Sequence, residues 1–557
     1  MTFLSILQLI VNILFFVIII GGIIACISLY VIDKRQKHHS VLRNYPVLGR
    51  VRYFLESIGP ELRQYLILND NAGKPFSRKQ YLNIVMPGKY KNRIESFGSL
   101  RKFEEPGFYL QNTMFPVDHD ELEINQDEQM STFIYEISNE GLFDRKEEQK
   151  QKDVDPYKLT TDNQIIIGGD LKHPFIVNRL VGQSGMSYGA LGKNAITALS
   201  KGLGRSGSWM NTGEGGLSNH HLSGDCDIIF QIGPGLFGVR DKEGNFDEKE
   251  FFEKANMKQV KAFELKLAQG AKTRGGHIEG AKVTEEIAEI RNVTPFETVN
   301  SPNRFEFLHN NKELLQFVQR LRELSDKPVG IKIVVGNIND LKKLIHEMVS
   351  SNIIPDFITV DGGEGGTGAT YQELVDTVGL PLFSALPILD VELKKFKIRD
   401  KVKVFASGKL ITPDQIAIAL ALGADLVNVA RSLMINVGCI MAQQCHTNNC
   451  PVGVATTDPK KESALVVSEK EYRVSNYIVS LHEGLFNLAA AVGVKSPNQI
   501  NENHLLYRSA NGNVMNVNQY KKPYIKRIKN RPEQLSVQVY FYKSKSSSSI
   551  CMSLSSG

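Results

Sequence analysis

The chain has 557 residues, of which 42% are hydrophobic and 23% are charged, and these fractions are ordinary for a globular protein. This length allows one large barrel together with smaller additions. The formal net charge of +6 is small for such a length, so the charge gives no indication of nucleic-acid binding. The scattered cysteines Cys26, Cys226 and Cys551 provide no disulfide framework, which fits a reducing compartment.

The N-terminal segment is apolar. Residues 9–32 are interrupted only by Asn12 and a few small residues, and the run is long enough to cross a bilayer. No charged side chain precedes it, and four basic residues follow it: Lys34, Arg35, Lys37 and Arg43. A cleaved signal peptide is the alternative, but it needs a basic start and a shorter apolar core. We therefore predict a transmembrane anchor at residues 1–32, single-pass, with the rest of the chain in the cytoplasm.

Residues 33–163 show no clear period. They contain glycine and proline breaks and the aromatic residues Phe97, Phe103, Phe108 and Tyr109. Residues 145–155 form a charge run, which is typical of a solvated face or a linker. We assign residues 33–163 to a juxtamembrane segment and a small cap region that packs against the next domain.

From residue 174 onward, short apolar runs end repeatedly in Gly, Ser or Asn. Eight of these runs are predicted strands: residues 175–181, 208–211, 227–232, 262–268, 329–335, 357–360, 402–406 and 425–429. Several segments between them, such as 194–201, 312–324 and 414–422, have helical patterns. Eight strand–helix units predict an α/β fold, a (β/α)8 TIM barrel, over residues 164–500. Residues 501–557 form a C-terminal extension whose serine-rich tail, 544–557, has a composition typical of disorder.

Three predicted strands end in loops with distinctive composition. Residues 185–190 (GMSYGA) suit either a flat ring lying against the backbone or a tight turn. In residues 211–216 (NTGEGG), Glu214 is either exposed to a ligand at the barrel mouth or a carboxylate at a helix start. Residues 269–277 carry Lys272 and Arg274, which suit a dicarboxylate, although a solvated basic loop has the same composition.

Lys332 lies inside an otherwise apolar strand, where an ammonium group is costly unless it is paired. A side chain that snorkels to the sheet end is the alternative. Residues 361–369 (DGGEGGTGA) form a loop that allows close backbone approach. The dinucleotide pattern GxGxxG occurs at residues 202–207, 233–238 and 363–368, but no nucleotide-binding βαβ half surrounds it, so we reject an NAD(P) domain.

The stretch from residue 402 to residue 459 combines two kinds of site. Its first strand ends in Ser407-Gly408-Lys409 and its second ends near Ala430-Arg431. TIM barrels often bind phosphate after strands seven and eight, where backbone amides approach the anion.

Three cysteines follow within twelve residues, at Cys439, Cys445 and Cys450, and Pro451 comes next. Three thiolates with a Cys-Pro ending favour an iron–sulfur cluster, and a site without a fourth cysteine can hold three irons. A zinc site completed by His446 and inert thiols are the alternatives.

The run GCIMAQQCHTNNCPVGVAT (residues 438–456) resembles the cluster segment of glutamate synthase, and ASGKLIT (residues 406–412) resembles its FMN phosphate loop. The resemblance covers residues 174–459. It implies FMN as a cofactor and a [3Fe-4S] cluster on Cys439, Cys445 and Cys450. The implied FMN-binding residues are Met186, Ser187, Asn211, Lys332, Gly365, Gly366, Thr367, Ser407, Gly408, Lys409, Ala430 and Arg431.

The resemblance also implies a substrate site. Gln269, Lys272 and Arg291 correspond to ligands of 2-oxoglutarate, and Glu214 and Lys332 are the implied catalytic residues. His277 departs from the family, because the large synthases have a glutamine there, and this departure bears on substrate fit.

The implied reaction is reductive amination of 2-oxoglutarate to L-glutamate through 2-iminoglutarate. Its partners are ammonia or an amine donor and an electron donor protein, either a ferredoxin or a reductase subunit. The alternatives are a methylglutamate synthase-like enzyme and a membrane-tethered electron carrier without substrate turnover.

Overall fold

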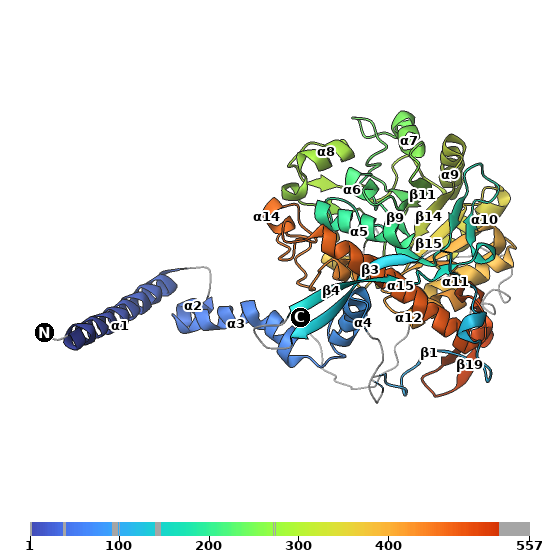
Figure 1. Ribbon diagram of the computed structural model, residues 1–557. Helices are drawn as coiled ribbons and strands as arrows, with labels where there is room; N and C mark the ends of the chain where they lie inside the picture. The colour runs from blue at the N-terminus through green and yellow to red at the C-terminus, as the bar shows by residue number, and fades with distance from the viewer. Residues whose placement is uncertain are drawn as a thin grey trace, which may run out of the picture. The chain divides into compact units, whose positions relative to one another are not determined.

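The computed structural model describes residues 3–36, 40–91, 99, 101–127, 129–139, 146–270, 272 and 275–522 (Figure 1). The chain divides into two compact units, Met1–Met86 with Ile94–Leu100, and Pro87–Arg93 with Arg101–Gly557. Residues 101–163, which the sequence analysis groups with the juxtamembrane segment, therefore belong to the same unit as the barrel. The serine-rich tail, Phe97, Arg145 and Arg274 lie outside the described residues.

The first unit is helical. It contains α1 (Phe3–Arg35), α2 (Ser40–Asn44), α3 (Leu48–Leu62), the π-helical turn η1 (Arg63–Ile67) and most of α4 (Arg78–Gly88). Within α1, Leu7–Arg35 is long and apolar enough to cross a membrane, and its most apolar 18-residue stretch contains no buried residue. A signal sequence near the N-terminus can meet the same criterion of length and composition.

The second unit is built on a closed barrel of eight parallel strands. In chain order the strands are β8 (Val181–Gln183), β9 (Trp209–Asn211), β10 (Asp227–Ile232), β11 (Val260–Lys266), β14 (Val329–Ile333), β15 (Phe357–Asp361), β16 (Lys403–Ser407) and β17 (Leu426–Val429). Every residue of β14 and β15 is buried, as expected of strands covered on both faces. This confirms the predicted TIM barrel.

Amphipathic helices surround the barrel. In α9 (Asn311–Ser325), for example, the Asn310 side chain caps the first turn and one apolar face is buried. The other long helices of this unit are α5 (Lys193–Ser206), α7 (Glu248–Ala255), α10 (Ile338–Ser350), α11 (Leu382–Lys395), α12 (Pro413–Ala421) and α15 (Val467–Val492). Helix α15 packs against α5 and α12, and its buried His482 accepts a hydrogen bond from the Leu180 amide (2.9 Å), so it holds the chain where it enters β8.

The second unit also contains smaller elements. The short helices are α6 (Asn219–Leu222), α8 (Glu285–Arg291), α13 (Arg431–Asn436) and α14 (Pro459–Glu462). A three-stranded sheet contains β1 (Gly107–Leu110), β18 (Leu505–Arg508) and β19 (Val514–Asn516). Antiparallel pairs are β2 (Ile124–Asn125) with β5 (Lys158–Leu159), β3 (Met130–Asn139) with β4 (Lys146–Val154), β6 (Ile165–Ile167) with β7 (Phe175–Val177), and β12 (His277–Ile278) with β13 (Val299–Asn300).

The structure corrects one sequence-based expectation and decides between two interpretations of another segment. The predicted first strand, residues 175–181, is two strands, because β7 pairs with β6 in a hairpin and the barrel begins only at Val181. The alternating burial of β7, with Ile176 exposed, marks a strand with one solvated face. Of the two interpretations of the charge run at residues 145–155, the solvated face is confirmed and the linker is not. The run contains β4, in which residues 148–153 are exposed while Val154 packs into the core.

Candidate functional site

The predicted site residues gather at one end of the barrel, because parallel strands bring their carboxyl ends together. Lys266, Asp361 and Ser407 are the last residues of β11, β15 and β16. Lys332 lies near the end of β14, and Glu214 follows β9 by three residues. A small open hollow lies at this end. Its lining residues are Glu214, Pro234, Lys266, Leu267, Ala268, Lys272, Gly275, Pro302 and Asn303.

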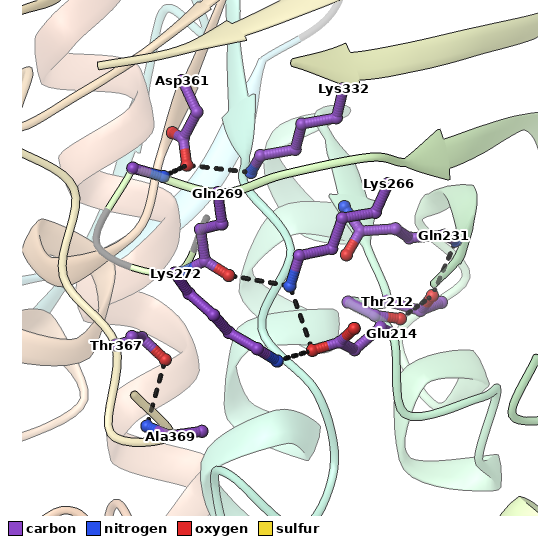
Figure 2. Close-up of polar contacts among 12 residues, drawn as sticks. Thr212, Glu214, Gln231, Lys266, Gln269, Lys272, Lys332, Asp361, Thr367 and Ala369 are labelled. Carbon is purple, nitrogen blue, oxygen red and sulfur yellow. Dashed lines mark hydrogen bonds and ion pairs between the residues drawn. The ribbon is translucent and has the colours of Figure 1, made fainter. Parts of the chain in front are cut away.

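Two lysines share one carboxylate in this hollow. The Nζ atom of Lys266 lies 3.0 Å from Oε1 of Glu214, and the ammonium group of Lys272 donates to the same oxygen. Lys266 also donates to Oε1 of Gln269 at 2.8 Å. Figure 2 shows both lysine side chains pointing toward Glu214 from the β11 side. Two cations and one anion leave an excess of positive charge, which favours an anionic ligand.

Burial and charge shift the protonation of this cluster in opposite directions. Burial lowers the pKa of Lys266 to about 8, although the Glu214 carboxylate favours the charged form. Burial alone would raise the pKa of Glu214, but the ammonium groups of Lys266 and Lys272 outweigh it and hold that pKa well below its usual range. Glu214 therefore stays ionised, while Lys266 can exchange a proton near neutral pH.

Lys266 was not among the residues predicted from the sequence. The sequence signal for Lys266 was weaker than that for Lys332, because the strand that Lys266 ends (VKAFELK) also carries Lys261 and Glu264. The structure decides how Lys332 is accommodated: its side chain is 3% exposed, so it does not snorkel to solvent. Its Nζ atom lies 3.3 Å from Oγ of Ser184 and 3.6 Å from Oδ2 of Asp361.

Asp361 and Ser184 connect Lys332 to the surrounding loops. Oδ2 of Asp361 also accepts the Gly270 amide at 2.9 Å, which fixes the loop after β11 (Figure 2). Oγ of Ser184 lies 3.2 Å from Oγ of Ser407, so the loops after β8 and β16 meet at the same lysine. Lys332 is thus a buried, paired cation at the centre of the barrel mouth.

A second polar network lies inside the barrel and holds the loop after β9. Asn211 donates to Oε1 of Glu264 at 2.8 Å, and Gln231 donates to the same oxygen at 2.6 Å. The side-chain oxygen of Asn211 accepts the Gly213 amide at 3.0 Å. Glu264 therefore positions Asn211, and Asn211 in turn positions the residue that precedes Glu214.

The two other predicted substrate ligands occupy different places. Gln269 lies beside Lys272, with their backbones hydrogen-bonded to each other, and its side chain reaches the Gly366 carbonyl at 3.2 Å. Arg291 is not among the residues lining the hollow. Its buried guanidinium donates to the Tyr188 carbonyl at 2.8 Å, and burial lowers its pKa to about 10. His277 also points elsewhere, toward Glu279 and Asn300.

The loops predicted to bind FMN contact one another closely. Met186 and Ser187 pack against Gly213, where a Cβ atom would lie 2.7 Å from the Ser187 nitrogen. Thr367 accepts the Ala369 amide at 3.2 Å (Figure 2), and Gly365 donates to the Gly362 carbonyl at 3.0 Å. Gln183, the last residue of β8, has a buried side-chain amide. Within the described residues, neither its nitrogen nor its oxygen has a hydrogen-bond partner. At this end of the barrel, a ligand could therefore approach the backbone closely and could form hydrogen bonds with the Gln183 amide.

The predicted phosphate loop has a neighbour that the sequence did not indicate. Oε1 and Oε2 of Glu364 accept the Leu382 amide at 3.1 and 3.0 Å at the start of α11. A Cβ atom on Gly408 would lie 3.3 Å from the same carboxylate and 3.1 Å from Cβ of Leu382. Burial raises the pKa of Glu364. Arg431, directly after Ala430, donates to the Glu364 carbonyl at 2.7 Å. Lys409, beside Gly408, has a positive φ of 53°.

The three predicted cluster ligands lie in the segment after α13. Burial raises the pKa of the Cys439 thiol to about 11, and the charges of Cys445 and Cys450 contribute to this increase. No three His, Cys, Asp or Glu side chains in the described ranges are placed to hold a single metal ion. A multi-iron cluster does not need that arrangement, because each thiolate binds a different iron.

The cysteine segment is tied to the barrel mouth by Lys282. This buried lysine donates to the carbonyl oxygens of Ala190, Cys445 and Ala455, at 3.1, 3.1 and 3.3 Å. Ala190 belongs to the loop after β8, and a Cβ atom on Gly368 would lie 3.2 Å from Cβ of Cys445. The segment therefore touches two of the loops that form the site.

Comparisons with known proteins agree on one family. Residues 119–495 match the conserved region in glutamate synthase. The chain is 57% identical, over 88% of its length and 94% of the relative, to the glutamate synthase large subunit-like protein YerD of Bacillus subtilis.

More distant relatives match less of the chain. This chain is 32% identical to the archaeal glutamate synthase [NADPH] of Methanocaldococcus jannaschii, over 56% of the chain and 58% of that relative. A solved mandelate oxidase variant with an FMN adduct aligns with a TM-score of 0.38 and 15% identity, over 64% of this chain and 83% of the oxidase. On the family match and the YerD identity, the chain belongs to the glutamate synthase family.

Proposed function

We propose that this chain uses FMN to convert 2-oxoglutarate and ammonia into L-glutamate through 2-iminoglutarate. As a member of the glutamate synthase family it is an oxidoreductase. The observation that carries the specific reaction is the Lys266–Glu214–Lys272 cluster in the hollow at the barrel mouth. It places two cations and one anion where the loops predicted to hold the flavin meet.

Each member of the cluster has a distinct task. The ammonium groups of Lys266 and Lys272 pair with the carboxylates of the dicarboxylate substrate and position it. Glu214, which stays ionised, accepts hydrogen bonds from the substrate nitrogen as the imine forms. Lys266, with its pKa near 8, donates the proton that lets the keto oxygen leave as water.

The residues at the mouth fit a flavin. The close contact of Gly213 with Met186 and Ser187 and the unpartnered Gln183 amide suit a flat, polar-edged ring. Lys332 would face that ring, and the loops at residues 365–367, 407–409 and 430–431 would hold the rest of the cofactor. Bound FMN would supply the hydride that reduces the imine carbon. Asp361 keeps the Lys332 ammonium in place for this role.

The cysteine segment fits a cluster that feeds the flavin. Three thiols near one another, on a segment held to the mouth by Lys282, suit a [3Fe-4S] cluster that passes single electrons. The electrons come from a donor protein, a ferredoxin or a reductase subunit. With α1 as a membrane anchor, we propose that the enzyme works at the cytoplasmic face of a membrane.

The decisive experiment is anaerobic reduction of the purified protein, followed by 2-oxoglutarate and ammonium. Return of the oxidised-flavin absorbance, with glutamate detected by mass spectrometry, supports the proposal. Reoxidation only with an alkylamine in place of ammonium would favour a methylglutamate synthase-like enzyme. A flavin that reduces but is not reoxidised by either mixture would favour an electron carrier.

The phosphate loop gives a first prediction. We expect Gly408→Asp to remove most of the bound FMN, because the new carboxylate would repel the phosphate and would crowd Glu364 and Leu382. Gly408→Ala adds the same Cβ atom without the charge, so it should keep clearly more flavin. Flavin content, measured by absorbance after denaturation, checks both variants. Full FMN occupancy in Gly408→Asp would rule out this loop as the phosphate site.

The pH dependence of substrate binding gives a second prediction. Because the pKa of Lys266 is lowered to about 8, its ammonium charge is present below that pH and is lost as the pH rises. The dissociation constant of 2-oxoglutarate should therefore increase above pH 8, by up to about tenfold per pH unit. Lys266→Arg keeps its charge throughout this range and should abolish the rise. Titration of the flavin spectrum with 2-oxoglutarate measures the dissociation constant at each pH. A dissociation constant of the native protein that does not change above pH 8 would contradict the role of Lys266.

A further inference from the structure

Helix α3 has an exposed apolar face. Leu48 and Phe54 are 72% and 61% exposed, and they share one side of the helix with other apolar residues. The members of this face are Leu48, Val51, Phe54, Leu55, Ile58 and Leu62. Their spacing of three and four residues defines a single stripe. Ser57 and Glu56 lie on the other side, so α3 is amphipathic, with its apolar side turned outward.

The apolar surface continues into η1. Tyr65, Leu66 and Ile67 are exposed there as well, Leu66 at 77%. A contiguous surface of this kind on a water-soluble protein usually marks an interaction site.

The start of α3 is fastened to the end of α1. The carboxylate of Asp33, two residues before α1 ends, is fully buried within this unit. It accepts the Val47 amide at 2.9 Å and the Arg50 guanidinium, with Nη2 at 2.6 Å from Oδ1. Lys34 adds a hydrogen bond to the Arg43 carbonyl at 3.1 Å. The apolar face of α3 therefore begins beside the point where the candidate membrane span ends.

We propose that α3 and η1 lie flat on the membrane surface, with the apolar face of α3 in the boundary between lipid headgroups and acyl chains. The inference rests on α1 being a membrane span. Continuity with that span selects a lipid surface as the occupant, because Asp33 and Arg50 keep the start of α3 at the same level as the end of α1.

The charges of the segment favour the same occupant. The sequence from residue 33 to residue 67 contains three acidic residues, Asp33, Glu56 and Glu61, and seven basic ones: Lys34, Arg35, Lys37, Arg43, Arg50, Arg52 and Arg63. Such an excess suits anionic lipids, and a helix that is apolar on one side and charged on the other is typical of interfacial helices. The anchor would then consist of one spanning helix and one surface helix, which limits how freely the first unit can move.

The single native tryptophan makes a clean test possible. Trp209 is 1% exposed inside the barrel, so it gives a constant background. The full-length protein is reconstituted in anionic vesicles whose acyl chains carry bromine, which quenches nearby tryptophan. Three variants each add one tryptophan at an exposed position: Val17→Trp in α1, Leu55→Trp on the apolar face of α3, and Ser57→Trp, about 200° around the same helix.

We expect loss of most of the added fluorescence, with blue-shifted emission, in Val17→Trp and Leu55→Trp but not in Ser57→Trp. Quenching of Val17→Trp alone would overturn the proposal and leave the membrane span intact, with the apolar face covered by protein instead. Equal quenching of Leu55→Trp and Ser57→Trp would also overturn it. An unquenched Val17→Trp would refute the span itself and the surface helix with it.

Discussion

Replacing Lys272 with methionine is expected to raise the 2-oxoglutarate concentration needed for half-maximal turnover by at least about 30-fold. Loss of one partner from a buried charge pair costs about 2–5 kcal/mol, and each 1.4 kcal/mol corresponds to about a factor of ten. Methionine keeps most of the length of the side chain but carries no charge. Because Lys272 lines the hollow and not the loops assigned to FMN, flavin content should be unchanged.

The measurement is the rate at which chemically reduced flavin is reoxidised at a saturating ammonium concentration and increasing concentrations of 2-oxoglutarate. Lys343→Met is a matched control, because Lys343 is an exposed lysine of α10 that pairs with Asp340. If the Lys272→Met variant and the control reach half-maximal rate at the same 2-oxoglutarate concentration, the substrate carboxylates bind elsewhere. The implied role of Arg291 would then need testing first, although in this structure its guanidinium is directed to Tyr188.

The barrel could be predicted from the sequence because its strands carry a strong local signal. Buried parallel strands such as β14 and β15 read as continuous apolar runs ending in Gly or a polar residue. The first strand was misplaced because residues 175–181 (FIVNRLV) were taken as one strand, although Asn178 and Arg179 interrupt the apolar pattern between β7 and β8. The pairing of β7 with β6 confirms that the two strands are separate. Such pairing is a long-range property that the local pattern does not contain.

The site was predictable only in part, for a similar reason. A lysine in an otherwise apolar strand must find a partner, and this argument identified Lys332. It did not identify Lys266, because its strand (VKAFELK) also carries Lys261 and Glu264. It also did not reveal the partners of the two lysines, because Asp361 ends β15 and Glu214 lies in the loop after β9. The position of Glu364 beside Gly408 depends on how the loop after β15 meets α11, and no spacing rule encodes it. The roles assigned to the glycine-rich loops came from family resemblance and not from their composition.

The cysteine segment carries the largest expected effect. Changing Cys439, Cys445 or Cys450 singly to serine should remove one thiolate and lose or degrade the three-iron cluster. Iron content and the electron paramagnetic resonance signal of the oxidised protein measure this loss. Cys226→Ser is the matched control, because Cys226 is buried beside Ser200, outside the segment, and should leave the cluster intact.

Flavin binding and cluster binding should separate in these variants. The loops assigned to FMN precede Cys439, and Lys282 holds the segment through the backbone carbonyls of Cys445 and Ala455, not through a thiol. Each serine variant should therefore keep FMN and still aminate 2-oxoglutarate when the flavin is reduced chemically, but lose turnover driven by a one-electron donor protein. Stoichiometric zinc in place of iron, or donor-driven turnover unchanged in all three variants, would refute the electron relay. The loss of only the donor-driven reaction would instead locate the electron entry at this segment, because the substrate cluster of Glu214, Lys266 and Lys272 is untouched by all three changes.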